Sequence, residues 1–158
     1  MNHLFIDAYN VIFATDSLRQ VMQGSLDAAR DQLAEIVRSI HDVEGLHTVL
    51  VLDSRQDSIQ VEHPYKVKTF EFVYAPAELS ADGVIERMVA QVEKSIDTTV
   101  VSNDRMVRES ARASGALALR PEALIEWARV CESRLLHEAR RRRDVNRKEF
   151  RNSINFES

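Results

Sequence analysis

The chain has 158 residues, of which 44% are hydrophobic and 29% are charged. This length suits one domain with one sizeable core, and the composition is that of an ordinary globular protein. No apolar run is long enough for a transmembrane helix, and Asp7 interrupts the only stretch that could begin a signal peptide. One cysteine, Cys131, excludes an internal disulfide and a thiolate metal cluster and suits a reducing compartment. We therefore expect a cytoplasmic protein without a membrane partner.

The formal net charge of −4 is unevenly distributed along the chain. Between Arg134 and Arg151 there are eight Lys or Arg residues and three acids, so this segment carries +5 and the remainder carries −9. A basic segment on an acidic body favours contact with a polyanion, because phosphate binding depends on local rather than net charge. The alternative is a solvated helix end that keeps the protein soluble.

Strand-like and helix-like segments alternate along the chain. In order, the patterns predict a strand at 4–7, a loop or short helix at 10–22, a helix at 25–42, strands at 48–53 and 69–74, a helix at 80–96, a strand at 98–102, a helix at 104–114, a strand at 116–119 and a helix from Pro121 through Leu135. This alternation predicts an α/β sandwich around a mainly parallel, five-stranded sheet. We assign 1–139 to this domain and 140–158 to a basic, helical C-terminal extension and tail.

Acidic residues follow four of the five predicted strands. Asp7 and Asp53 end the first two strands, Asp82 and Glu86 follow the third, and Asp104 follows the fourth. In an open parallel sheet, ligands bind outside the carboxyl ends of the strands. Each acid taken singly has an ordinary explanation as a helix cap or turn residue. Capping alone does not account for Asp at the ends of both of the first two strands.

Asp82 and Glu86 are four residues apart and therefore share one face of the predicted helix. They lie beside Ile85 and Val89, at the edge of the apolar stripe rather than on the solvent face. Acids gathered there repel one another and raise each other's pKa unless a cation lies between them. Mg²⁺ or Mn²⁺, held by a few carboxylates and several waters, is a suitable counter-charge. Such an ion could activate water for attack on a phosphodiester, the chemistry of many nucleases.

The sequence lacks the motifs of competing enzyme classes. Neither a nucleotide-binding glycine loop nor a serine nucleophile elbow is present, and the five histidines show no metal-ligand spacing. A metal-dependent phosphatase would normally have a second Asp two residues after its nucleophilic Asp, but position 9 is Tyr.

Four segments in the same order and spacing resemble the NYN domains of the YacP type, which are PIN-like ribonucleases. They are "FIDAYNVI", "LVLDS", "ELSADGVIERMV" and "VVSNDRMVRESARASGA". The resemblance covers the chain from His3 to about Leu136. It implies a PIN-like three-layer α/β/α sandwich and a divalent-metal-dependent endoribonuclease, which is a hydrolase acting on RNA phosphodiester bonds. Ala8 stands where the family usually has Gly, and Ser80 stands where it often has Thr; the former matters if that position requires positive φ.

The resemblance also implies roles for the acids. We expect Asp7, Asp82 and Asp104 to form the inner shell of a Mg²⁺ or Mn²⁺ site, with Asp53 and Glu86 supporting it or serving a second ion. Asn10 would orient Asp7 or contact the scissile phosphate. The catalytic set is therefore Asp7, Asn10, Asp53, Asp82, Glu86 and Asp104. A ribosomal partner and a translation-linked RNA substrate stay open.

Basic residues supply candidates for RNA binding. Those near the second strand are Arg55, Lys66 and Lys68, with Tyr65 available for base stacking, although an ordinary polar connection explains them as well. Arg105 and Arg108 follow Asp104 and could face phosphate. The four consecutive arginines Arg140, Arg141, Arg142 and Arg143 are the strongest candidate. Positive charge combined with an aromatic side chain favours single-stranded RNA as the partner. A catalytically silent module that binds RNA or a ribonucleoprotein surface is the main alternative to an enzyme.

Overall fold

The computed structural model describes the backbone of residues 2–157 and the side chains of residues 2–152. The elements follow in the order β1 (His3–Asp7), α1 (Ala8–Ala14), α2 (Asp16–Gly24), α3 (Leu26–Glu44), β2 (His47–Asp53), β3 (Gln60–Glu62), β4 (Phe70–Ala75), α4 (Ser80–Gln91), the 3-10 turn η1 (Ser95–Asp97), β5 (Thr98–Val101), α5 (Arg105–Ala113), β6 (Leu117–Leu119) and α6 (Pro121–Glu157). None of the described helices combines the length and apolarity that a bilayer crossing requires.

Across the described residues the strands form one six-stranded sheet in the order β3-β4-β2-β1-β5-β6. All neighbours run parallel except β3, which pairs antiparallel with β4 at the edge. The α/β sandwich with a mainly parallel central sheet is therefore confirmed. The predicted number of five strands is wrong by one, because the residues of β3 are all exposed and lack an apolar pattern.

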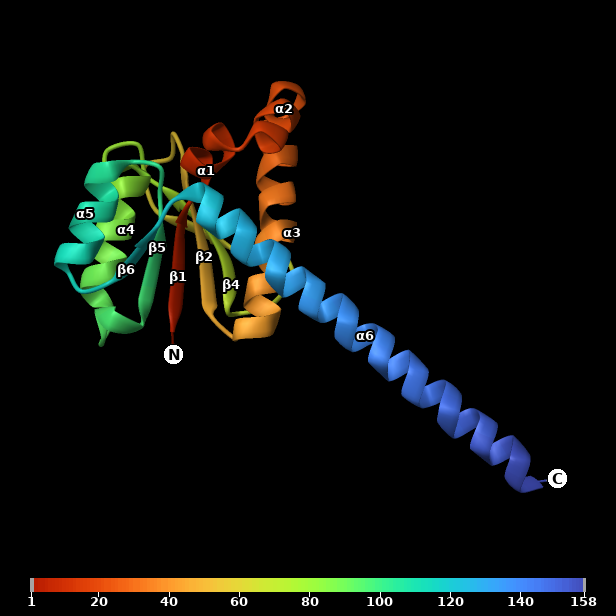
Figure 1. Cartoon of the computed structure of the whole chain (residues 1–158). Coiled ribbons are helices and arrows are strands. Elements are labelled where there is room, and N and C mark those ends of the chain that lie inside the picture. The colour runs from red at the N-terminus through yellow and green to blue at the C-terminus, as the bar shows by residue number, and fades with distance from the viewer. Residues whose placement is uncertain (1, 158) are drawn as a thin grey trace.

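Helices cover both faces of the sheet (Figure 1). Leu4 and Ile6 of β1 point into a core shared with α1, α3 and the start of α6. Phe5, between them, points into a second core under α4 and α5. Successive side chains of a strand point to opposite faces, so Asp7 lies on the same face as Phe5. By the same alternation Asp53 follows Val49 and Val51 of β2 onto that face. Strand geometry therefore directs both acids toward the layer of α4 and α5.

The structure settles one open helical prediction, corrects a second and agrees with a third. The ambiguous segment 10–22 forms two helices, α1 and α2, joined at Thr15, whose hydroxyl donates to the Val11 carbonyl at 2.8 Å. The helix predicted over 80–96 ends at Gln91, and Ile96 is 77% exposed rather than part of its apolar stripe. The final helix continues to Glu157, so the basic residues after 139 prolong it, in agreement with the predicted helical extension. It packs on α3 and then projects beyond the rest of the molecule (Figure 1).

Gly45 ends α3 in the left-handed conformation, with φ of 65°, and its N–H donates to the His41 carbonyl at 3.0 Å. A methyl group at this position would have nothing within 4 Å, so the cost of Gly45→Ala is purely conformational. We expect this variant to lose about 1 kcal/mol in free energy of unfolding, measured by urea denaturation. Gly24→Ala is the matched control, because Gly24 is equally open but lies within α2 and has no left-handed φ. Equal effects of the two changes would contradict this account.

Candidate active site

The carboxyl ends of the central strands meet where the sheet reverses its order. β1 pairs with β2 on one side and with β5 on the other, so the chain builds outward in both directions from β1. Such a reversal leaves a crevice at the carboxyl ends of the two strands that flank it. Asp7 ends β1 at this position, and Ser102 follows β5 beside it. We call this region the carboxyl edge.

Asp7 is the most buried acid at the carboxyl edge, with 3% of its surface exposed. The Ser102 hydroxyl donates to Asp7 Oδ2 at 3.2 Å. Burial raises the pKa of Asp7 to about 7, and the nearby negative charge of Asp82 is the next cause of the rise. The bond from Ser102 opposes this effect but does not cancel it. At neutral pH Asp7 is therefore poised between its protonated and ionised forms.

Asp82 lies in the first turn of α4 and faces Asp7 across the carboxyl edge. Protonated Asp7 donates a hydrogen bond to Asp82. Desolvation raises the pKa of Asp82, and the charge of Asp104 raises it further. Two carboxyls in contact cannot both be ionised cheaply without a cation between them. The electrostatic repulsion of this pair is therefore a cost that a bound cation would relieve.

Asp53 supports the start of α4. Its Oδ1 accepts a hydrogen bond from the Ala81 backbone N–H at 2.7 Å, which satisfies one of the unpaired donors in the first turn. The adjacent Ser80 has a φ of 65°, an uncommon value for a residue with a side chain. The Asp53 contact thus holds a turn with an unfavourable backbone conformation, and Asp82 follows directly. The charge of Asp53 also contributes to the raised pKa values of Asp7 and Asp82.

Asp104 and Asn10 fix the loop after β5. Asp104 Oδ1 accepts from the Met106 N–H at 2.9 Å and so caps α5. Asn10 Oδ1 accepts from the Asn103 N–H at 3.1 Å, which ties this loop to α1. Asn10 therefore contacts the loop next to Asp104, whereas its predicted contact with Asp7 is not among the hydrogen bonds of the described residues. Ala8 is the first residue of α1 and has no positive φ, so the methyl group in place of glycine is accommodated.

A cavity of about 420 Å³ opens over the acids. Asp7, Asp53 and Asp82 line it together with Asn10 and Phe13. No group of three His, Cys, Asp or Glu side chains within the described part of the chain is arranged to hold a metal ion. Mg²⁺, however, is commonly bound through one or two carboxylates with waters completing its shell. The Asp7–Asp82 pair fits that donor set, and the predicted addition of Asp104 to the inner shell stays a prediction.

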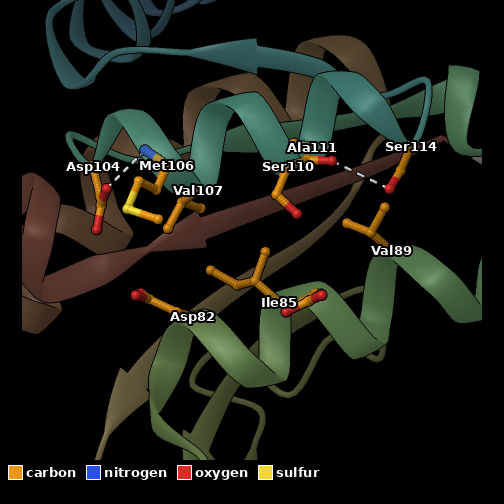
Figure 2. A pocket seen from close by; sticks show the side chains of 10 residues that line it. Asp82, Ile85, Val89, Asp104, Met106, Val107, Ser110, Ala111 and Ser114 are labelled. Atoms are coloured by element: carbon orange, nitrogen blue, oxygen red, sulfur yellow. Dashed lines mark hydrogen bonds between the residues drawn. The ribbon is translucent and has the colours of Figure 1, made fainter.

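Glu86 lies one turn beyond Asp82 and does not line this cavity. It lines a neighbouring groove between α4 and α5, to which Asp82 and Asp104 also contribute (Figure 2). The structure therefore brings Asp7, Asp53, Asp82 and Asp104 to one edge and places Glu86 farther along α4. The spacing of Asp82 and Glu86 predicted that they share one face of the helix. Both residues line the groove between α4 and α5, as this prediction requires.

The predicted RNA-binding residues are dispersed. Arg55 is exposed in the loop that follows β2, near the carboxyl edge, whereas Lys66 and Lys68 precede β4 and lie at the opposite end of the sheet. Arg105 is exposed at the start of α5 and pairs with Glu109 at 2.8 Å. The four arginines of 140–143 are exposed on the projecting part of α6 (Figure 1). The first of them is about 28 Å along the helix axis from Pro121.

Two residues of the site carry roles that sequence reasoning did not assign. Ser102 bonds Asp7, as described above, and its oxygen also accepts from the Asp104 N–H at 3.1 Å. Arg108, which we expected could face phosphate, is only 6% exposed and donates to the Ser102 carbonyl at 3.0 Å. The signal for Ser102 was present in the segment "SND", whose serine falls on the same strand face as Val100. The inward direction of Arg108 had no comparable signal.

Tyr65, expected to stack on bases, is instead occupied within the protein. Its ring packs edge-on against Phe70 at 5.2 Å and lies under the Arg38 guanidinium, and its hydroxyl donates to Glu35 at 3.0 Å. Its loop also lies at the end of the sheet away from the acids. This segment therefore does not extend the carboxyl edge.

Comparison with known proteins agrees with this architecture. No curated protein matches the chain in sequence. A crystal structure of a mutant of Rae1 (YacP) from Bacillus subtilis superposes with a TM-score of 0.75 at 22% identity, covering 91% of this chain and 85% of that one. A second Rae1 (YacP) structure from the same organism gives a TM-score of 0.72 at 22% identity, covering 99% and 88%. These likenesses show the fold.

The family comparison goes further than the fold. The model of the YacP-like NYN domain matches residues 4–158, nearly the whole chain. The NYN domains of this type are a PIN-like nuclease family, which supports a nuclease or RNA-related role. The resemblance seen in the strand-end motifs is confirmed: the chain belongs to the YacP-like NYN domain family.

Proposed function

We propose that this protein is a divalent-metal-dependent endoribonuclease that hydrolyses phosphodiester bonds of single-stranded RNA at the carboxyl edge. The observation that carries the proposal is the contact between Asp7 and Asp82, in which burial and mutual repulsion raise the pKa of Asp7 to about 7. A cation between the two carboxyls would stabilise both in their ionised form. Mg²⁺ or Mn²⁺ fits, since both are hard ions that bind carboxylates and water.

The residues of the chain have separate tasks in this proposal. Asp7 and Asp82 would bind the ion, which when bound supplies positive charge to the phosphodiester and lowers the pKa of a water. Ser102 holds Asp7 through its hydroxyl, and Asp53 holds the first turn of α4 through Ala81. Asn10 holds the loop before Asp104. Asp7 and Asp53 are thus held by hydrogen bonds to the scaffold before any substrate arrives.

The basic part of α6 supports RNA binding at a distance from the acids. Arg140 to Arg143 are exposed, and none of them forms an ion pair with the described side chains. α6 starts at the carboxyl edge, because Pro121 follows the end of β6. A strand bound along the helix would therefore be held by its backbone on one side of the site. A ribosome-associated RNA is one substrate that such an arrangement would suit.

The Asp7–Asp82 pair gives the direct test of catalysis. Asp7→Asn and Asp82→Asn should each lower Mn²⁺-dependent cleavage of single-stranded RNA by about two orders of magnitude or more, because ion binding supplies several kcal/mol of charge stabilisation. Asp97→Asn is the matched control, since Asp97 is exposed just before β5, at the other end of the sheet. Cleavage of labelled RNA is followed with Mn²⁺ and with chelator. Asp7→Asn or Asp82→Asn variants that cleave at the parent rate would refute the catalytic role of these acids. If the parent protein binds RNA but does not cleave it, the result would favour the alternative of a catalytically silent RNA-binding module.

The raised pKa of Asp7 gives a test that needs no catalysis. In chelator, the unfolded chain ionises Asp7 near pH 4, whereas the folded protein keeps the proton until about pH 7. Folded protein therefore binds more protons between these values, so stability falls as pH rises from about 4 to about 7. At about 1.4 kcal/mol per pKa unit, the loss is roughly 4 kcal/mol at most.

Asp7→Asn removes this titration. Thermal unfolding in chelator should show the variant gaining stability relative to the parent as pH rises from 4 to 8. Adding Mn²⁺ at pH 8 should raise the melting temperature of the parent more than that of the variant. A parent-to-variant difference that is the same at both pH values would contradict the raised pKa.

The arginines of α6 give a salt-dependence test. Changing Arg140, Arg141, Arg142 and Arg143 together to Gln should weaken binding to labelled single-stranded RNA in fluorescence anisotropy. The slope of log affinity against log salt should flatten by about 0.7 for each RNA phosphate that the variant no longer neutralises. The matched control changes the same four residues to Lys, which keeps the charge and should keep most of the slope. An unchanged slope in the Gln variant would exclude this surface from RNA binding.

A further inference from the structure

A second hollow adjoins the acidic cavity and has different chemistry. It is a groove of about 350 Å³ between α4 and α5, with Asp82 and Asp104 at one end (Figure 2). Asp82 also lines the acidic cavity, so the two hollows adjoin at this residue. A molecule that occupied both would place one part among the acids and another part between the helices.

The walls of the groove are mainly apolar. Ile85 and Val89 of α4 face Val107 of α5 across it (Figure 2). Ile85 and Val89 are almost fully buried in the second core, so this wall is preformed. Met106 stands at the acidic end, and it is 78% exposed. Apolar walls with a flexible thioether at the mouth are suited to a flat aromatic ring.

The polar side chains of the groove are carboxylates and hydroxyls rather than cations. Glu86 lines it, and the Ser110 hydroxyl points into the space between the helices (Figure 2). None of the described residues that line it is Lys or Arg, so nothing there would neutralise a phosphate. A neutral, planar group with N–H donors matches this lining, and nucleobases with an exocyclic amino group have that chemistry.

We propose that the groove between α4 and α5 is a base-binding subsite that holds the nucleobase next to the cleaved phosphodiester. The subsite prefers cytosine, adenine or guanine over uracil, because Glu86 accepts a hydrogen bond from an exocyclic amino group that uracil lacks. The inference rests on the proposed nuclease function, since Asp82, which lines both hollows, then faces the phosphate of the same nucleotide. Glu86 is in this account a specificity residue.

Filling the groove tests the inference. Ser110 is exposed, so Ser110→Phe should fold normally while its ring occupies the space between the helices. We expect this variant to raise KM for single-stranded RNA about tenfold, and to leave cleavage of an oligonucleotide with an abasic ribose beside the cleaved bond within about twofold. Ala113→Phe is the matched control, because Ala113 is exposed on the same helix and does not line the groove.

Glu86→Gln tests the preference itself. Oligonucleotides that differ only in the base beside the cleavage site should be cleaved with about a tenfold preference for cytosine over uracil by the parent, and this preference should fall toward one in the variant. Two results would overturn the inference if the parent protein cleaves RNA: an unchanged base preference in Glu86→Gln, or an unchanged KM in Ser110→Phe. Neither result would contradict the nuclease function.

A binding measurement separates the two proposals. Cytidine and uridine are titrated into the full-length, metal-free protein, and backbone amide shifts are followed by NMR. We expect cytidine to shift the amides of Val89, Val107 and Ser110 more than uridine does, and the shifts to disappear in Ser110→Phe. Absence of such shifts would overturn the subsite whether or not the parent cleaves RNA. If cytidine shifts these amides but the protein cleaves no RNA, the groove is a base-binding site and the nuclease function is rejected.

Discussion

The parallel pairing of β1 with both β2 and β5 is the constraint on which the site depends. It brings the carboxyl ends of these strands to one edge and reverses the order of the sheet beside Asp7. The alternation of side chains then turns Asp7 and Asp53 toward the layer of α4 and α5. Like charges meet there as a consequence of backbone geometry. The hydrogen bonds from Ser102 and Ala81 hold those charges in place.

The acids at the carboxyl edge lower the free energy of unfolding of the protein. An acid that is 3% exposed and touches a second acid destabilises the folded protein at neutral pH, and Ser80 adds an unfavourable backbone conformation nearby. The two apolar cores, packed on opposite faces of the sheet, compensate for these costs. Strain and charge repulsion that occur together at one edge of a fold are typical of functional sites.

Much of the fold and of the acidic edge could be predicted from sequence, for identifiable reasons. Buried parallel strands are nearly continuous apolar runs, and an acid that ends such a run is visible without a structure. β3 has no such run, so its residues give no strand signal. Because β3 turns the chain back along β4, Lys66 and Lys68 reach the far end of the sheet although they follow Asp53 closely in sequence. The spacing of residues along the chain does not predict that Arg108 points inward to the Ser102 carbonyl. It also does not predict that Asp53 accepts a hydrogen bond from the Ala81 N–H.

The central claim is that Asp7 and Asp82 together bind a divalent cation. A crystal of the protein grown with Mn²⁺ and measured at the manganese absorption edge tests this claim most directly. We expect an anomalous peak within coordination distance of both carboxyls, with Asp53 still bonded to Ala81. An anomalous map without a peak at this pair, with the two carboxyls still sharing a hydrogen bond, would contradict it.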